Sequence, residues 1–94
     1  MSGWTYIMTN RPGGVLYIGV MTRLAERIDQ HRRGSGPSFC RRYGLTRLVL
    51  AEPHDTIEGA IAREKALKAW KRAWKVELIE ATNPQWNDLF DHIA

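Results

Sequence analysis

Two short apolar runs near the start of the chain are separated by turn residues. Residues 4–9 and 15–20 are rich in tryptophan, threonine, tyrosine, isoleucine and valine, which favour β-strands. The segment between them, residues 10–14, has the sequence Asn-Arg-Pro-Gly-Gly, in which proline presets its own φ and the glycines accept positive φ. We therefore predict a β-hairpin over this part of the chain.

The length of the turn decides which side chains of the hairpin share a face. A four-residue loop over residues 11–14 places Tyr6 opposite Gly19 and puts Tyr17 on the same face as Tyr6, because side chains alternate along a strand. Glycine at this place would leave room above the Tyr6 ring. A loop of odd length would separate the two tyrosines, unless a bulge at one of the loop glycines brought them back together.

Further along the chain, apolar residues recur with helical spacing. Residues 22–33 carry a narrow apolar stripe, and Thr22 is the candidate N-cap. Residues 45–52 are predicted to form a third strand that Pro53 ends. The other helical segments that we predict are residues 38–43, 56–75 with Thr56 as N-cap, and 74–82 with or without a bend before it. A terminal segment at residues 86–90 should return Trp86 and Phe90 to the core.

The composition limits the class of protein. The chain has 94 residues, the size of one domain, and we predict a single domain over residues 1–94. A hydrophobic fraction of 44% with four tryptophans favours a folded globule. No apolar run approaches the ~18 residues of a membrane span, and the first residues do not resemble a secretory signal. With one cysteine, Cys40, no internal disulfide can form, so we expect a cytoplasmic protein with no membrane partner.

Charge is distributed unevenly along the chain, whose net charge is +4. Residues 23–47 contain seven arginines against two acids, whereas residues 76–94 contain four acids and no lysine or arginine. Such asymmetry indicates nucleic-acid binding, although a solvated basic face explains it equally well.

Two helical segments carry candidate chemistry. Arg23, Arg27 and His31 follow one another at steps of four, so they share one side of the first predicted helix. On the helix predicted for residues 56–75, Glu64 falls near the middle of the apolar side. An unpaired buried carboxylate is costly, so Glu64 must face a polar cavity, pair with a cation or hold a metal.

In this order, Tyr6, the Tyr-Ile-Gly run that begins at Tyr17, Arg27 and Glu64 resemble the GIY-YIG nuclease superfamily, and within it the small single-domain bacterial members. The similarity runs from Trp4 to about Phe90. The first motif departs from the family name, because it reads Trp-Thr-Tyr and not Gly-Ile-Tyr, and of that triplet only the tyrosine carries chemistry.

The resemblance implies an α+β fold with a small three-stranded antiparallel β-sheet flanked by helices. It also implies one Mg²⁺ or Mn²⁺ ion, with Glu64 as its single protein ligand. The implied catalytic residues are the active-site tyrosines Tyr6 and Tyr17, the arginine Arg27, His31 near the scissile phosphate, Glu64 and, as a further site asparagine, Asn83. Which tyrosine acts as general base is left open. We expect Tyr6 and Tyr17 to share a sheet face that looks at both Arg27 and Glu64.

Taken together, these features predict a divalent-metal-dependent endonuclease that hydrolyses phosphodiester bonds in DNA, which is a more probable partner than RNA, with low sequence specificity. Branched, damaged and single-stranded substrates are all compatible with it. The residues expected to contact phosphates are Arg23, Arg32, Arg33, Arg41, Arg42, Lys68 and Lys71.

Plainer explanations exist for each residue taken alone. The two tyrosines could be half-buried sheet aromatics, Glu64 could pair with Arg27, and Asn83 could simply end a helix before Pro84. Accordingly, one alternative function is a nucleic-acid-binding module of the same fold with little or no cleavage activity. Another is a module that binds a protein partner through the acidic tail.

Overall fold

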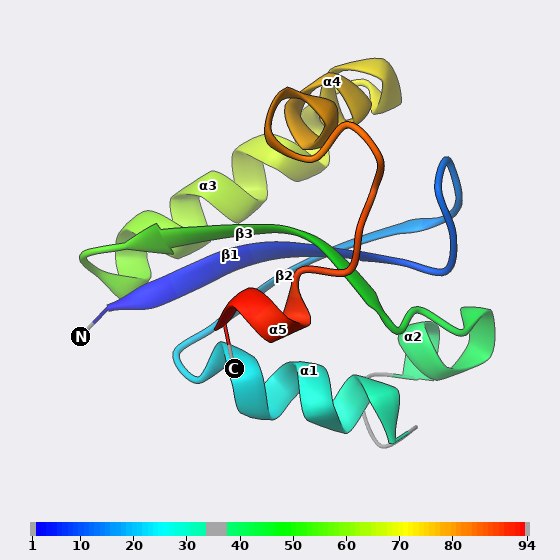
Figure 1. Cartoon of the computed structure of the whole chain (residues 1–94). Helices are drawn as coiled ribbons and strands as arrows, with labels where there is room; N and C mark the ends of the chain where they lie inside the picture. Colours follow the sequence, from blue (N-terminus) through cyan, green and yellow to red (C-terminus); the bar gives the residue numbers. More distant parts are fainter. Residues whose placement is uncertain (1, 34–37, 94) are drawn as a thin grey trace.

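A computed structural model describes residues 2–33 and 38–93, without the side chains of His31, Ser38, Phe39, Cys40, Asp91 and Ile93. Three strands form an antiparallel sheet in the order β2-β1-β3, which confirms the predicted α+β fold (Figure 1). The strands are β1 (Gly3–Thr9), β2 (Leu16–Met21) and β3 (Arg47–His54). The helices are α1 (Leu24–Arg32), α2 (Ser38–Tyr43), α3 (Ile57–Ala69), α4 (Arg72–Thr82) and α5 (Phe90–Ile93).

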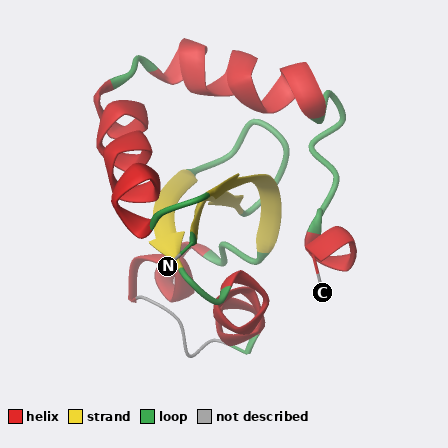
Figure 2. Cartoon of the chain, turned by 90° about the vertical axis from the view of Figure 1, so that its left-hand side faces the viewer, coloured by secondary structure: helices red, strands yellow, loops and turns green. Residues whose placement is uncertain are grey.

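Helices cover both faces of the sheet. In Figure 1, α3 and α4 lie above the strands and α1 and α5 lie below them, and Figure 2 shows the strands between these layers. Each face buries its own apolar cluster, as expected for a sheet between two layers of helices. The buried cluster on the α1 side consists of Tyr6, Met8, Leu24, Ile28, Leu45 and Leu48. The buried cluster on the α3 side consists of Ile7, Ile18, Val49, Leu50, Leu67, Ile79 and Trp86.

The hairpin has the predicted register. Tyr6 pairs with Gly19, and Tyr17 lies opposite Met8, so both tyrosines point to the α1 side. In the loop, Gly13 has a φ of 71°, a backbone conformation that glycine adopts without strain. The Gly14 N–H donates to the carbonyl of Arg11 at 2.9 Å, which closes the turn. Local turn chemistry thus fixes which face the tyrosines occupy.

The third strand differs from its prediction. It was expected at residues 45–52 with Pro53 as its end, but β3 runs through Pro53 to His54. This is tolerated because β3 is an edge strand, and a proline on the outer side of an edge removes no hydrogen bond from the sheet. A register shift opposite Ile7 and Met8 marks a bulge, and as a result both Val49 and Leu50 face the α3 side.

The helix predicted for residues 56–75 is interrupted. It begins as expected, because the Gly59 N–H donates to the Thr56 hydroxyl at 3.0 Å as an N-cap hydrogen bond. It ends at Trp70, where ψ is 151°, and α4 starts after Lys71, where ψ is 148°. The two extended residues turn the chain, so α3 and α4 are separate helices. The first helix, α1, is shorter than the predicted range of 22–33 at both ends.

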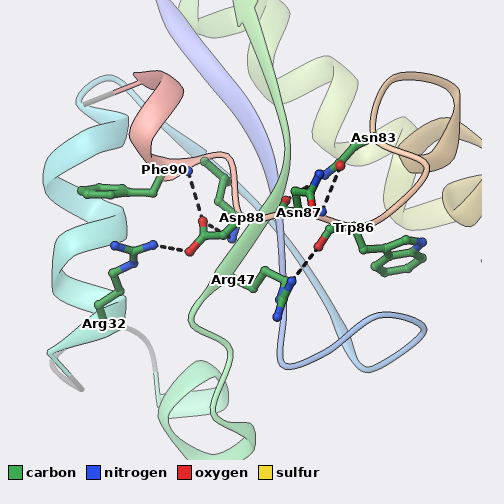
Figure 3. Close-up of polar contacts among 8 residues, drawn as sticks. Arg32, Arg47, Asn83, Trp86, Asn87, Asp88 and Phe90 are labelled. Atoms are coloured by element: carbon green, nitrogen blue, oxygen red, sulfur yellow. Dashed lines mark hydrogen bonds and ion pairs between the residues drawn. The ribbon is translucent and has the colours of Figure 1, made fainter.

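The segment after α4 crosses the outer edge of β3 (Figure 3). Trp86 is buried on the α3 side, whereas Phe90 packs on the α1 side, so the prediction that both return to the core is confirmed. Between them, the Leu89 N–H donates to the Leu48 carbonyl at 2.8 Å, and Asp88 accepts from the Leu48 N–H at 3.3 Å. We call residues 83–90 the edge clasp. Within the part of the chain that the structure describes, no helix has the length and apolar character needed to cross a bilayer.

Candidate active site

Two tyrosines form the centre of the candidate site. Their ring centroids lie 6.2 Å apart with the ring planes tilted by 47°. Tyr6 is almost completely buried, with 2% of its surface exposed, and Tyr17 is half-buried. A Cβ atom at Gly19 would lie 2.6 Å from both Cζ and Oη of Tyr6, which is far inside van der Waals contact. Glycine at this position therefore makes the space in which the Tyr6 ring lies.

Arg27 lies on α1, the helix that packs on the same sheet face as the tyrosines. It lies on the helix between Leu24 and Ile28, which belong to the same buried cluster as Tyr6. Its Nε atom is buried and has no hydrogen-bond partner among the residues that the structure describes. Buried polar groups in folded proteins are nearly always paired, and a donor left without a partner costs stability. The planar fork of a guanidinium matches the oxygens of a phosphate.

Glu64 comes from the opposite layer. Its helix α3 packs on the other face of the sheet, where the Thr5 hydroxyl donates to the Ala60 carbonyl at 2.9 Å. The expectation that one sheet face would look at Tyr6, Tyr17, Arg27 and Glu64 together is therefore wrong as stated. The tyrosines and Arg27 share one side of the sheet, and the helix of Glu64 lies on the other.

The two layers meet at the outer edge of β2. There, a hollow of about 380 Å³ is lined by residues of β2 together with lysines of α3 and α4: Leu16, Tyr17, Ile18, Lys68 and Lys75. The Lys68 ammonium lies 3.2 Å from the Glu64 carboxylate, whose side chain is 21% exposed. Lys68 thus links Glu64 to the hollow that Tyr17 lines. We call this place the β2-edge site.

The residues at the β2-edge site fit a hard divalent cation bound by few protein ligands. Among the described residues, no group of three or more histidine, cysteine, aspartate or glutamate side chains could form a protein cage for a metal. Mg²⁺ commonly binds one or two carboxylates and takes its remaining ligands from water and substrate phosphates. Glu64, a partly exposed carboxylate beside the hollow, meets this requirement.

A sequence model of the GIY-YIG catalytic domain matches residues 2–77, which is most of the chain. The chain belongs to the GIY-YIG family. This family is a nuclease superfamily, so the match indicates nuclease chemistry. The resemblance seen in the sequence is therefore confirmed.

Several relatives support this assignment to the GIY-YIG family. The UPF0213 protein of Cronobacter sakazakii is 30% identical over 79 residues, which cover 84% of this chain and 83% of the relative. The UPF0213 protein of Haloquadratum walsbyi is 34% identical over 65 residues, covering 69% of this chain and 73% of the relative. The solution NMR structure of a UPF0213 protein from Bacillus halodurans superposes with a TM-score of 0.59 at 27% identity, and covers 94% of this chain and 93% of that one.

Of the residues that the GIY-YIG resemblance selects, the structure places several near one another and places Asn83 at the other edge of the sheet. Tyr6, Tyr17 and Arg27 lie on one side of the sheet. Glu64 lies in the other layer and is joined to the hollow of Tyr17 through its ion pair with Lys68. The side chain of His31 lies outside the described residues, although its backbone belongs to α1.

Asn83 has a structural role in this GIY-YIG fold. It is 4% exposed, and its side-chain nitrogen donates to the carbonyls of Val49 at 3.2 Å and Asn87 at 2.9 Å. Its side-chain oxygen accepts the Asn87 N–H at 2.9 Å. The bond to Val49 attaches the edge clasp to β3, and the two bonds with Asn87 fix the start of the clasp itself. The central strand β1 separates β3 from β2. We therefore leave Asn83 out of the site.

Most of the side chains predicted to contact phosphates are exposed, but Arg32 already contacts another part of the protein. Arg23 and Arg33 flank α1 and are about three-quarters exposed, and each pairs with an acid on that helix, Glu26 and Asp29 respectively. Arg32 instead forms an ion pair with Asp88 and lies over the Phe90 ring at 4.1 Å, so it joins α1 to the edge clasp (Figure 3). The remaining members of the predicted set are exposed: Arg41, Arg42, Lys68 and Lys71.

The sequence did not predict the roles of two arginines that hold other parts of the fold in place. Arg72 donates to the carbonyls of Gly13 and Gly14 at 2.8 and 2.6 Å, which ties the hairpin loop to the start of α4. Arg63 forms a two-pronged pair with Glu52 at 2.9 and 3.2 Å. The hydrogen bond that Arg63 donates to the Glu52 carboxylate raises the pKa of Arg63 above its ordinary value. No local pattern marks either arginine, because both partners lie far away in the sequence.

Proposed function

We propose that the protein is a divalent-metal-dependent endonuclease that hydrolyses phosphodiester bonds in DNA with low sequence specificity. The observation that carries this proposal is Arg27, whose buried Nε has no partner among the described residues and which comes from the helix packed on Tyr6. A buried donor without a partner lowers stability, and a bound ligand that accepts its hydrogen bond would remove that penalty. A phosphate is such a ligand for a guanidinium.

The residues at the β2-edge site would divide the chemistry as follows. Arg27 binds the scissile phosphate and stabilises the negative charge that develops on its oxygens. Tyr17 lines the hollow with Lys68 and Lys75 and is more exposed than Tyr6, so in this proposal Tyr17 takes a proton from an attacking water. Tyr6, which is buried, orients Tyr17 through the contact between their rings.

The metal has one protein ligand in this proposal. Glu64 would hold a single Mg²⁺ or Mn²⁺, and the chemistry such an ion supplies when bound is Lewis-acid stabilisation of the phosphate and of the leaving oxygen. Lys68, at 3.2 Å from Glu64, holds the carboxylate toward the hollow.

Low sequence specificity follows from the surfaces that would face nucleic acid. The exposed cations are arginine and lysine side chains on helices α1, α2 and α3 and at the start of α4, and such side chains contact phosphates without reading bases. Sequence reading requires an element that enters a groove and contacts base edges. The binding should accordingly weaken steeply with salt.

The decisive experiment is a cleavage assay on a panel of duplex, nicked, branched and single-stranded DNA and their RNA counterparts, with Mg²⁺ or Mn²⁺ present. Glu64→Gln should lower the rate of cleavage by about 100-fold or more while nucleic-acid binding is retained. Glu58→Gln is the matched control, because Glu58 is an exposed acid in the first turn of the same helix. Binding without cleavage of any substrate in the panel would instead identify a binding module.

A further inference from the structure

Another hollow lies at the corner between α3 and α4, outside the β2-edge site. It has a volume of about 470 Å³, within the range of small-ligand pockets, and is lined by Trp70, Trp74, Glu77 and Leu78. Trp70 is the residue at which α3 ends, and the other three lie on one side of α4 at helical spacing. We call it the tryptophan hollow. The interruption of the helix at Trp70 is what creates this corner.

The aromatic rings in the tryptophan hollow are open to a flat ligand. Trp74 is 49% exposed, which is unusual for so large an apolar side chain, whereas Trp70 is half-buried. Their ring centroids are 6.2 Å apart, and the planes are inclined at 82°, so the two rings do not cover each other face to face. A nucleobase can therefore stack on an aromatic face that the fold leaves uncovered.

The ring of Trp70 is held in place from behind. The guanidinium of Arg63 lies 5.1 Å from its centroid, and Arg63 is itself fixed by its two hydrogen bonds to Glu52 on β3. A chain of contacts thus runs from the sheet to the wall of the hollow. Rigid aromatic walls bind with a smaller entropy cost than mobile ones.

One lysine lies near the tryptophan hollow, and the lysine that follows Trp74 lines the β2-edge site. The Lys71 ammonium lies 5.6 Å from the centroid of the Trp74 ring. Lys75, the next residue after Trp74, lines the hollow of Tyr17. Adjacent residues of α4 therefore face the two hollows. Aromatic faces next to lysines fit a strand of nucleic acid, whose bases stack while its phosphates pair with the cations.

We propose that the tryptophan hollow binds one unstacked nucleobase of a single-stranded segment that neighbours the phosphate at the β2-edge site. This inference rests on the proposed function, because it takes a nucleic acid as the substrate, and it narrows the substrate to one with an unpaired nucleotide near the cut. Glu77 adds a hydrogen-bond acceptor to the wall, which suits the amino group of cytosine better than thymine.

The test is the affinity of the full chain for fluorescein-labelled oligothymidylate and oligodeoxycytidylate probes of about 12 nucleotides, measured by fluorescence anisotropy. Trp74→Ala should weaken binding of both probes by about tenfold, and Trp74→Phe should restore most of it. Trp74→Leu keeps an apolar side chain without an aromatic face, so it should behave like the alanine variant. The oligodeoxycytidylate probe should bind more tightly, and Glu77→Gln should reduce that preference.

Tyr43→Ala is the matched control, because Tyr43 is also an exposed aromatic residue near a cation, with Arg42 at 5.7 Å, but lies on α2. Equal losses in the Trp74 and Tyr43 variants would overturn the proposal, as would unchanged binding by Trp74→Ala and Trp74→Leu. A dimer of the wild-type chain in sedimentation velocity that Trp74→Leu abolishes would assign the hollow to a second copy and overturn it as well.

Cleavage assays separate this proposal from the proposed function. If the chain cuts the substrates of the panel but Trp74→Ala leaves both binding and the preference for unpaired nucleotides unchanged, the endonuclease stands and the base site fails. If the chain cuts nothing but binds the probes in a Trp74-dependent way, the base site stands and the endonuclease fails.

Discussion

At the β3 edge of the sheet the chain folds back on itself, whereas at the β2 edge a hollow remains beside Tyr17. The outer side of Leu48 on β3 is paired through both its N–H and its carbonyl with the edge clasp. Within the described residues, the strand pairing of β2 is with β1, and its outer side borders the hollow of Tyr17, Lys68 and Lys75. Both β2 and β3 are edge strands, but only the outer side of β3 is hydrogen-bonded to the edge clasp.

This difference separates stability from function in space. At the β3 edge, the side chains of Asn83 and Asp88 form hydrogen bonds with backbone groups and so stabilise the fold. At the β2 edge, Glu64 contacts one flexible lysine, and Arg27 on the adjoining layer keeps a buried N–H without a partner among the described residues. Two arginines of α1 show the contrast most directly. Arg32 contacts Asp88 and Phe90 of the edge clasp, whereas the Nε of Arg27 has no partner among the described residues.

Replacing Arg27 should have the largest effect on cleavage and none of the usual cost in stability. Arg27→Met keeps the apolar length of the side chain and removes the buried N–H that lacks a partner. Cleavage should fall by about 100- to 1,000-fold, while the free energy of unfolding stays the same or rises. Single-turnover cleavage and urea unfolding measure the two effects. In the control Arg33→Met, an exposed arginine just after the end of α1, both quantities should stay near wild type.

Replacing Asn83 should show the reverse pattern. Asn83→Ala removes three hydrogen bonds in a buried place and should lower the free energy of unfolding by about 3 kcal/mol, which is roughly 15 °C in Tm for a chain of this size. Cleavage by the folded fraction should be unchanged. Asn87→Ala is the matched control, because Asn87 takes part through its backbone. A loss of cleavage larger than the loss of folded protein would return Asn83 to the site.

A methyl group at Gly19 should test the contact between the two strands and the tyrosine pair. Gly19→Ala puts a carbon where Tyr6 now lies, so the ring must move, at a cost of about 2 kcal/mol and with a decrease in cleavage. Thermal unfolding and cleavage rates give both effects. In the background Tyr6→Leu, which removes the ring, the same alanine should cost less stability. An equal cost in the two backgrounds would contradict the geometry.

The smallest effect is expected from Arg32. Arg32→Met removes an exposed ion pair with Asp88 and the contact with Phe90, and should lower the free energy of unfolding by about 1 kcal/mol. Nucleic-acid affinity should not change, because the Arg32 guanidinium is already bound to Asp88 and Phe90. If the variant bound DNA more weakly than Arg33→Met, Arg32 would belong with the phosphate contacts after all.

Much of the fold was accessible from local chemistry. The loop of residues 10–14 determined the hairpin register, and that register placed Tyr6 and Tyr17 on one face. The anomaly of Glu64 within an apolar helical pattern predicted a polar partner, and the carboxylate pairs with Lys68, which lines the hollow of Tyr17. These features depend on neighbours in the sequence or on periodicity, and both are visible in a single chain.

The features that were missed depend on contacts between distant segments. No glycine or proline marks the interruption at Trp70, and the bulge at Val49 breaks the alternation that predicts which face a strand residue occupies. The side of the sheet on which α3 packs is likewise decided by tertiary contacts. The hydrogen bond from Asn83 to Val49 joins residues 34 positions apart, so a helix-ending asparagine and a site asparagine look the same in the sequence.

The edge clasp also has a consequence for the order in which the protein can fold during synthesis. All three strands leave the ribosome before residues 83–90, so β3 waits with its outer N–H and carbonyl groups exposed until the clasp is made. An open strand edge is a template for pairing with another chain. Conditions that slow docking of Trp86 or loosen the Asp88 contacts therefore favour aggregation through β3, even when the finished molecule is stable.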